Sequence, residues 1–129
     1  LLIGSKKDDL FGPTIVFGKG GVTVELERDT SLTLPPINKN QALRLMEDTK
    51  VYKLLKGYRG MKGVSVRNMQ QILYNFSKML VDFPELKEVD INPFSVDEKG
   101  GAVLDAKIVL DENMMDKHPK PFEHLAIQK

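Results

Sequence analysis

Apolar residues recur at two different spacings along this chain, and the spacings separate strand regions from helix regions. In the first third, the segments 14–17, 22–26 and 31–34 run apolar or alternate, and they are rich in β-branched residues. Such short runs are typical of strands. The opening segment 1–4 is interpreted as a strand as well, and Pro35-Pro36 is expected to end the third run.

A first helix is predicted directly after these prolines. Asn38 is a suitable N-cap, and Gln41 three residues later completes a weak capping box. These two residues predict a short helix over about 39–48. Its buried face is expected to consist of Ala42, Leu45 and Met46.

Two further helices follow from the same reasoning. A short one near 49–55 is expected to end at Gly57, because glycine is the usual residue just past a helix C-terminus. A longer one over about 66–82 is expected to stop before Pro84. The long helix is predicted from apolar residues at steps of three and four, namely Val66, Met69, Leu73, Phe76, Leu80 and Phe83.

Two strands, 86–94 and 102–110, are predicted to close the domain as a hairpin. Their residues alternate between two faces, and the segment 97–100 between them (Asp-Glu-Lys-Gly) has the composition of a turn. The predicted fold class is therefore α+β, with a mainly antiparallel sheet and helices packed on one face.

The register of this hairpin places two oxygen-bearing side chains opposite each other. If the loop is 97–100, then Asn92 faces Asp105, and Asp90 faces Lys107, which could hold that carboxylate in place. Directly opposed residues have Cα atoms roughly 4.5–5.5 Å apart. An amide and a carboxylate oxygen at that spacing suit a magnesium ion that also binds nucleotide phosphate. Polar residues on a hairpin face can also be merely solvated, and a shift of one residue in register would separate the pair.

The composition excludes several other kinds of site. The chain has 129 residues, 41% of them hydrophobic, which suits one compact domain, and a formal net charge of +1, which gives no strong field for nucleic acid or anionic lipid. Without any cysteine it can form no disulfide and no Cys-based zinc site, and no apolar run is long enough to cross a bilayer. The segment 56–63 is basic, aromatic and glycine-rich, so a nucleic-acid module is a rival interpretation; the alternative is a loop between helices in which Arg59 pairs with a carboxylate.

Several segments, in this order and spacing, resemble one enzyme family from about Gly4 to Leu110. The resemblance is to the ATP-grasp domain of ADP-forming acyl-CoA synthetases, which are related to succinyl-CoA synthetase beta chains. The matching segments are Phe-Gly-Pro-Thr-Ile-Val-Phe-Gly-Lys-Gly-Gly at 11–21, Val24-Glu25-Leu26, Leu34-Pro35-Pro36, Leu55 with Gly57 and Arg59-Gly60, Asp90-Ile91-Asn92-Pro93-Phe94, and Leu104-Asp105-Ala106-Lys107.

The resemblance implies a reaction and a set of site residues. Enzymes of this family interconvert acyl-CoA, ADP and phosphate with free acid, CoA and ATP, through an acyl phosphate and a phosphorylated histidine. By this likeness, Asn92 and Asp105 are the magnesium ligands. Glu25 would line the phosphate site and orient the phosphohistidine, or else be an exposed strand carboxylate. Gly18, Gly20 and Gly21 would let backbone amides approach a phosphate, or else form a tight turn between strands.

The resemblance also implies parts that this chain does not supply. Residues 1–110 would be the C-terminal part of an ATP-grasp domain, and residues 111–129 an extension or linker. The adenine pocket, the catalytic histidine and the CoA site would lie on the remaining ATP-grasp subdomain and on a CoA-binding domain or alpha subunit; His118 and His124 match no catalytic position. We expect a cytoplasmic enzyme that binds ATP or ADP with magnesium. Another ATP-grasp ligase and a non-catalytic regulatory remnant are the alternatives.

Overall fold

The structure is a computed structural model. It describes residues 1–20, 29–57, 65–92, 94–96, 101–103 and 105–115. The predicted strand over 22–26 therefore lies outside the described residues, as does most of the basic segment 56–63.

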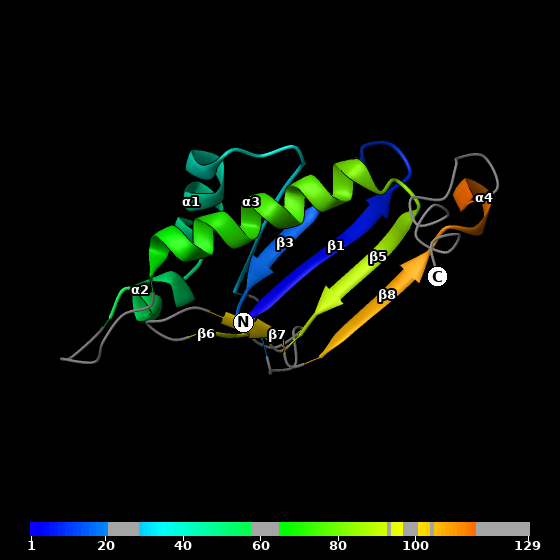
Figure 1. The fold of residues 1–129 in the computed structure, drawn as a ribbon. Helices are drawn as coiled ribbons and strands as arrows, with labels where there is room; N and C mark the ends of the chain where they lie inside the picture. Colours follow the sequence, from blue (N-terminus) through cyan, green and yellow to red (C-terminus); the bar gives the residue numbers. More distant parts are fainter. Residues whose placement is uncertain (21–28, 58–64, 93, 97–100, 104, 116–129) are drawn as a thin grey trace, which may run out of the picture.

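The main element is a six-stranded sheet in which every neighbouring pair is antiparallel. The strands follow the order β4-β3-β1-β5-β8, and β2 forms a short hairpin with the far end of β1. Figure 1 shows β3, β1, β5 and β8 running side by side. The bounds of the six strands are Leu2–Asp8 (β1), Gly12–Pro13 (β2), Ile15–Gly18 (β3), Thr30–Thr33 (β4), Leu86–Ile91 (β5) and Ala106–Leu110 (β8).

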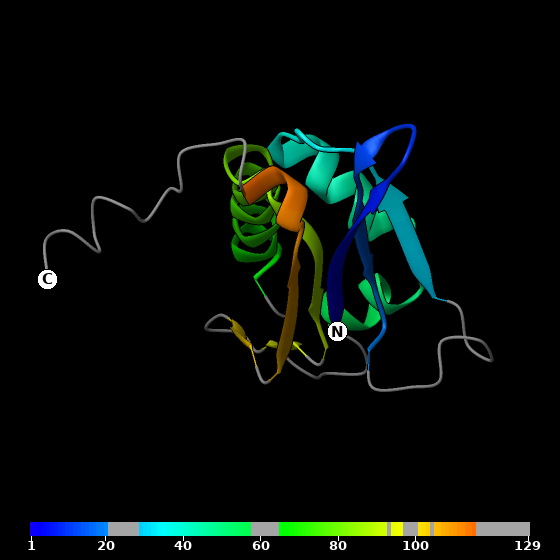
Figure 2. The ribbon, with the colours of Figure 1, turned by 90° about the vertical axis from the view of Figure 1, so that its right-hand side faces the viewer.

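Helices cover one face of this sheet, as the sequence predicted (Figure 1 and Figure 2). The first, α1 (Lys39–Glu47), begins at the predicted capping box of Asn38 and Gln41, in which both reciprocal hydrogen bonds are present at 2.8 Å. The short helix α2 (Val51–Leu55) is followed by Gly57 at a φ of 101°, a left-handed position that favours glycine. The long helix α3 has the predicted bounds, Val66–Asp82. A short helix, α4 (Glu112–Met115), follows β8.

The hydrophobic core lies between the helices and the covered face of the sheet. The predicted helix positions Ala42, Leu45 and Met46 are buried, whereas Val66 and Phe83 at the two ends of α3 are only partly buried. The core also contains the buried side chain of Ser77, whose hydroxyl accepts a hydrogen bond from the Ile37 N–H at 2.9 Å. The other buried residues of the core are Ile3, Ile15, Phe17, Ile37, Val51, Met69, Leu73, Phe76, Leu80, Val89 and Phe94.

The prediction of two long closing strands was wrong in one respect. Each of them is divided into two shorter strands, and the outer pieces, β6 (Phe94–Val96) and β7 (Gly101–Val103), form a separate two-stranded sheet. Proline at position 93 has no N–H to donate to a ladder, which is a physical reason for a break at this point. The predicted register nevertheless holds on both sides of the break, with Asp90 opposite Lys107 and Phe94 opposite Val103.

Candidate functional site

The candidate site lies at one end of the large sheet, where separate passes of the chain meet. The start of β1, the end of β3, the end of β5 and the start of β8 come together there, next to the small β6–β7 sheet (Figure 1). Leu1 and Phe94 join the two sheets by a reciprocal pair of bonds: the Leu1 amino group donates to the Phe94 carbonyl at 3.0 Å, and the Phe94 N–H donates to the Leu1 carbonyl at 2.8 Å.

Asn92 and Asp105 face each other at the break between the two sheets. The Asn92 N–H donates to the Asp105 carbonyl at 3.2 Å, and the flanking pairs Ile91–Ala106 and Phe94–Val103 have the same register. Asn92 is half-buried and Asp105 is exposed. The predicted opposition of the two residues is confirmed for the backbone.

Asp90 lies on the side of the sheet that the helices leave uncovered. Val89 is buried, and successive residues of β5 face opposite sides of the sheet. Asp90 pairs with Gly4 on one side and with Lys107 on the other. The expectation that Lys107 holds Asp90 is not met, because the described part of the chain contains no ion pair between them.

The carboxylate of Asp105 is oriented by its own chain. One oxygen, Oδ1, accepts a hydrogen bond from the Ala106 N–H at 2.9 Å. A carboxylate can accept about four hydrogen bonds or ligand contacts over its two oxygens, so this bond leaves coordination capacity. The Asp105 side chain is therefore restrained at the start of β8 while still exposed to a ligand.

Gly20 lies directly against Asn92. A Cβ atom built on Gly20 would lie 2.6 Å from Asn92 Oδ1 and 2.6 Å from the Leu1 carbonyl oxygen, closer than real Cβ contacts come. Gly18 is equally confined, because a Cβ there would collide with the Asp29 carbonyl oxygen and with Thr30. Gly18 and Gly20 thus leave space for neighbouring residues of the same chain.

Asp29 connects the chain next to these glycines to the start of α2. Its carbonyl accepts a hydrogen bond from the Lys19 N–H at 3.0 Å. Its carboxylate accepts from the N–H groups of Lys50 at 2.6 Å and Val51 at 2.7 Å, at the N-terminus of α2. No local sequence pattern indicates this role, because the partners are 21 and 22 positions away.

The remaining predicted site residues are not placed by the structure. Glu25 and Gly21 lie outside the described residues, and so do His118 and His124. Arg59 and its expected carboxylate partner also fall in a segment that is not described. Of the predicted glycines, Gly18 and Gly20 are described, with the steric surroundings given above.

The donor set at the break fits a hard cation that brings its own additional ligands. Asn92 and Asp105 offer one amide and one carboxylate oxygen. Within the described ranges, no group of three or more His, Cys, Asp or Glu side chains is arranged to hold a metal ion. Two protein oxygens are too few to enclose a free ion, but they suit magnesium that is also bound to nucleotide phosphate and water.

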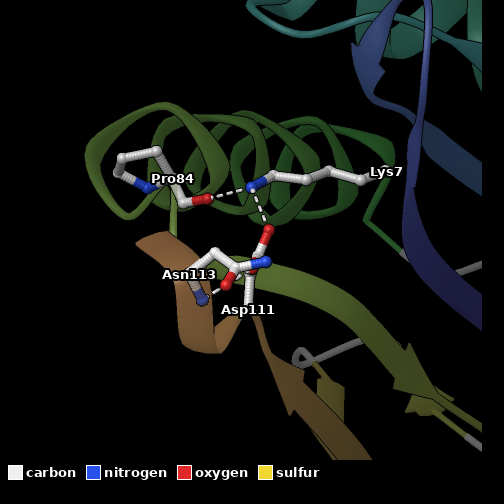
Figure 3. A network of polar contacts seen from close by, with 4 residues as sticks. All are labelled: Lys7, Pro84, Asp111 and Asn113. Carbon is white, nitrogen blue, oxygen red and sulfur yellow. Dashed lines mark hydrogen bonds and ion pairs between the residues drawn. The ribbon is translucent and has the colours of Figure 1, made fainter. Parts of the chain in front are cut away.

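The opposite end of the sheet carries a polar network of a different kind (Figure 3). Lys7 at the end of β1 donates to the Pro84 carbonyl and lies 3.7 Å from an Asp111 carboxylate oxygen. The same carboxylate accepts a hydrogen bond from the Asn113 N–H at 3.1 Å. This network ties the first turn of α4 to the sheet.

In the part of the chain that the structure describes, no helix has the length and apolar character needed to cross a membrane.

Comparison with known proteins gives one family model and a consistent group of relatives. Residues 1–110 match the model of the ATP-grasp domain. The chain is 40% identical over 114 residues to the ADP-forming acetate–CoA ligase I of Archaeoglobus fulgidus, covering 88% of this chain and 17% of that protein. It is 36% identical over 110 residues to the beta subunit of ADP-forming acetate–CoA ligase I of Pyrococcus furiosus, covering 85% and 47%.

A solved structure with the same fold is the dinucleotide-forming acetyl-coenzyme A synthetase 1 of Ca. Korarchaeum cryptofilum, in complex with coenzyme A and Mg-AMPPCP. It aligns with a TM-score of 0.79 at 40% identity, over 84% of this chain and 51% of that one. The chain thus spans about half the length of the beta subunit and of this solved chain, and a smaller part of the Archaeoglobus fulgidus ligase.

Proposed function

This chain belongs to the ATP-grasp domain family, and from that premise we propose that it is the magnesium- and nucleotide-binding part of an ADP-forming acyl-CoA synthetase. The complete enzyme would convert acyl-CoA, ADP and phosphate into free acid, CoA and ATP. Phosphate first displaces CoA to give an acyl phosphate. The phosphoryl group then passes to a histidine and from there to ADP, and all three steps are reversible.

The observation that carries this proposal is the opposition of Asn92 and Asp105 at the break between the two sheets. In a chain of this family, such a pair is suited to a magnesium ion held jointly with nucleotide phosphate. The solved relative named above contains Mg-AMPPCP, a nucleotide analogue with its metal, and coenzyme A. The two relatives named above, at 40% and 36% identity, are ADP-forming acetate–CoA ligases, and a third, at 38% identity, is an ADP-forming 4-hydroxybutyrate–CoA ligase of Nitrosopumilus maritimus; these names favour a small carboxylic acid as the substrate.

The chemical role of each group follows from the demands of phosphoryl transfer. Bound magnesium would neutralise charge on the phosphates and fix their orientation. Asn92 and Asp105 would hold it with neutral and anionic oxygens, so that the site does not carry an excess of negative charge beside the nucleotide. The half-buried position of Asn92 and the bond from Ala106 to Asp105 keep both side chains close to one geometry.

Two further roles belong to the proposal and await test. We assign Gly18, Gly20 and Gly21 to a segment whose backbone approaches the transferred phosphate, since its described end lies next to Asn92. We assign Glu25 the orientation of the phosphohistidine. The hydrogen bond from the Lys19 N–H to the Asp29 carbonyl holds the chain between Gly18 and Gly20, which supports a defined position for these two glycines.

Other parts must complete the site. The proposed partners are the remaining ATP-grasp subdomain, which would bind adenine, and a CoA-binding domain or alpha subunit, which would bring CoA and the histidine. The name of the Pyrococcus furiosus relative, a beta subunit, is consistent with such a division. Because ADP and CoA are cytoplasmic metabolites, we place the complete enzyme in the cytoplasm.

The test is the effect of removing each ligand in the complete enzyme. Asp105→Ala and Asn92→Ala should each lower the rate of ATP formation from acetyl-CoA, ADP and phosphate by at least about a hundredfold, which corresponds to roughly 2.7 kcal/mol of transition-state stabilisation. Circular dichroism should show both variants folded. The matched control is Asp82→Ala, which removes an exposed carboxylate at the end of α3 and should leave the rate unchanged. Full activity in both site variants would refute the assignment.

A second measurement concerns the chain by itself. Since the adenine pocket is assigned to another subdomain, calorimetry of residues 1–129 with Mg-ATP should show weak binding, and no synthetase activity should be detectable. Affinity as tight as that of an intact nucleotide enzyme would contradict this part of the proposal.

A further inference from the structure

We infer that Gly20 is a positioning residue for Asn92. Because glycine has no side chain, the amide oxygen of Asn92 can lie against Gly20, and this is the orientation in which it binds the metal. This inference rests on the proposed function, because it concerns the same magnesium site. It adds a second requirement to the phosphate approach proposed above for this segment. Gly20 also leaves the space that a neighbouring protein side chain, Asn92, occupies.

The space beside Gly20 is too small for a side chain. An added Cβ would lie 2.6 Å from Asn92 Oδ1 and 2.7 Å from the Leu1 carbonyl carbon, and real Cβ atoms essentially never come within 3.0 Å. Gly20 does not adopt a positive φ, so its backbone does not demand glycine. What excludes a side chain is the presence of Asn92 and Leu1.

Leu1 is held in place by hydrogen bonds, so its backbone cannot easily move to make room for a side chain at position 20. Its carbonyl accepts the Phe94 N–H at 2.8 Å, and its amino group donates to the Phe94 carbonyl at 3.0 Å. The chain just before Gly20 is also held, since the Lys19 N–H donates to the Asp29 carbonyl at 3.0 Å. The atom that Asn92 presents to Gly20 is at the far end of a rotatable side chain, so an added methyl group would turn its amide or push it away from Gly20.

Gly4 in the same sheet has no such confinement, whereas Gly18 and Gly101 are confined by residues other than Asn92. A Cβ on Gly4, in the middle of β1, would have its nearest neighbour, the Val89 carbonyl oxygen, at 3.4 Å. That is an ordinary contact, so Gly4 is not excluded from carrying a methyl group. Gly20 therefore has a steric requirement tied to the metal-binding side chain, and not one shared by all glycines around the sheet.

The direct test is a titration of the 129-residue chain with Mn²⁺ in the presence of excess ATP, followed by NMR. Paramagnetic broadening of the Ala106 backbone N–H signal, which lies on the Asp105 carboxylate, reports metal at this site in the wild type and in every variant. Gly20→Ala should weaken Mn²⁺ binding at Asn92 by about tenfold or more, as changes in groups that orient a metal ligand typically do. Broadening at the same Mn²⁺ concentration as in the wild type would overturn the inference.

A double-mutant cycle separates this role from a direct one. Asn92→Ala should abolish most of the Mn²⁺ response, and Gly20→Ala added to it should cause no further loss, because Gly20 acts through Asn92. Full additivity of the two losses would overturn the inference. If instead Asn92→Ala binds Mn²⁺ as the wild type does, the proposed function fails at its metal site, whatever Gly20 does.

In the complete enzyme, Gly20→Ala should raise the Mg²⁺ concentration for half-maximal ATP formation by about tenfold, while the rate at saturating Mg²⁺ and the KM for ADP change by less than about threefold. A raised KM for ADP or phosphate with unchanged Mg²⁺ dependence would show a phosphate contact and overturn the positioning role.

A measurement on the wild-type chain does not depend on whether a variant folds. The wild-type chain should show a nuclear Overhauser effect between the Gly20 α-protons and the Asn92 side-chain amide, and its absence would also overturn the inference.

Discussion

Replacement of Asp29 by alanine gives the sharpest test of how the fold holds the site segment in place. The Asp29 carboxylate accepts hydrogen bonds from the N–H groups of Lys50 at 2.6 Å and Val51 at 2.7 Å. These groups lie at the start of α2, where backbone N–H groups have no partner within the helix. Asp29→Ala removes both acceptors and leaves the Lys19–Asp29 backbone bond as the remaining link.

The size of the effect follows from the kind of bond that is lost. A hydrogen bond to a charged group contributes about 1.5–3 kcal/mol, and loss of a helix N-cap costs about 0.5–2 kcal/mol. Lys50 is exposed and water can replace its lost partner, whereas Val51 is buried and its N–H is harder to solvate. We therefore expect Asp29→Ala to lower the free energy of unfolding by about 2 kcal/mol, counting mainly the Val51 bond.

Urea denaturation followed by circular dichroism measures this change. With a slope near about 2 kcal/mol/M, a loss of about 2 kcal/mol lowers the midpoint by about 1 M. Asp29→Asn keeps one acceptor oxygen and should lose about half as much. Asp9→Ala, which removes the same charge at an exposed turn position, should leave the midpoint unchanged. Equal midpoints for Asp29→Ala and the wild type would refute the reasoning that this carboxylate anchors the segment to α2.

Three further substitutions test the core, the small sheet and the distal network by the same assay. Leu73→Ala, at a position with 0% exposure, should cost about 2–5 kcal/mol through a cavity under α3; a loss below about 1 kcal/mol would contradict the assigned packing. Gly101→Ala would push a methyl group against the Phe94 ring, which is 5% exposed, and should cost about 1–3 kcal/mol, so a neutral result would contradict the position of that ring. Asp111→Asn weakens a salt bridge whose side chains are 23% (Lys7) and 28% (Asp111) exposed, and should cost less than about 1 kcal/mol, an effect that should shrink further in high salt.

The parts of the fold that local sequence could predict are those governed by local rules. The bounds of α3 were predicted correctly because its apolar period is continuous and Pro84 prevents its extension. The pairing of Asp90 with Lys107 was predicted because a turn ending in Gly100 fixes the register of the strands that it joins. Once the register was known, the opposition of Asn92 and Asp105 followed from counting residues.

The parts that sequence could not predict depend on contacts between distant segments. The link between the two sheets depends on Leu1, which is hydrogen-bonded to Phe94 across 93 positions. The short hairpin of β1 and β2 went unnoticed, because a two-residue strand has no periodicity. The confinement of Gly20 arises from Leu1 and Asn92, and neither is near it in sequence.

The same long-range contacts explain why the proposed metal site should depend on the fold of the whole domain. The Asn92–Asp105 pair alone could be made by an isolated hairpin, but a two-stranded hairpin is marginally stable in water and would not hold two ligands in one geometry. In this chain, Leu1, which directly precedes β1, holds the hairpin at Phe94, and Gly20, just after the end of β3, confines Asn92. Three segments must therefore be folded together before the ligands are ordered. Because such a site forms only in the native state, metal and nucleotide binding should stabilise the entire domain against unfolding, and not the hairpin alone.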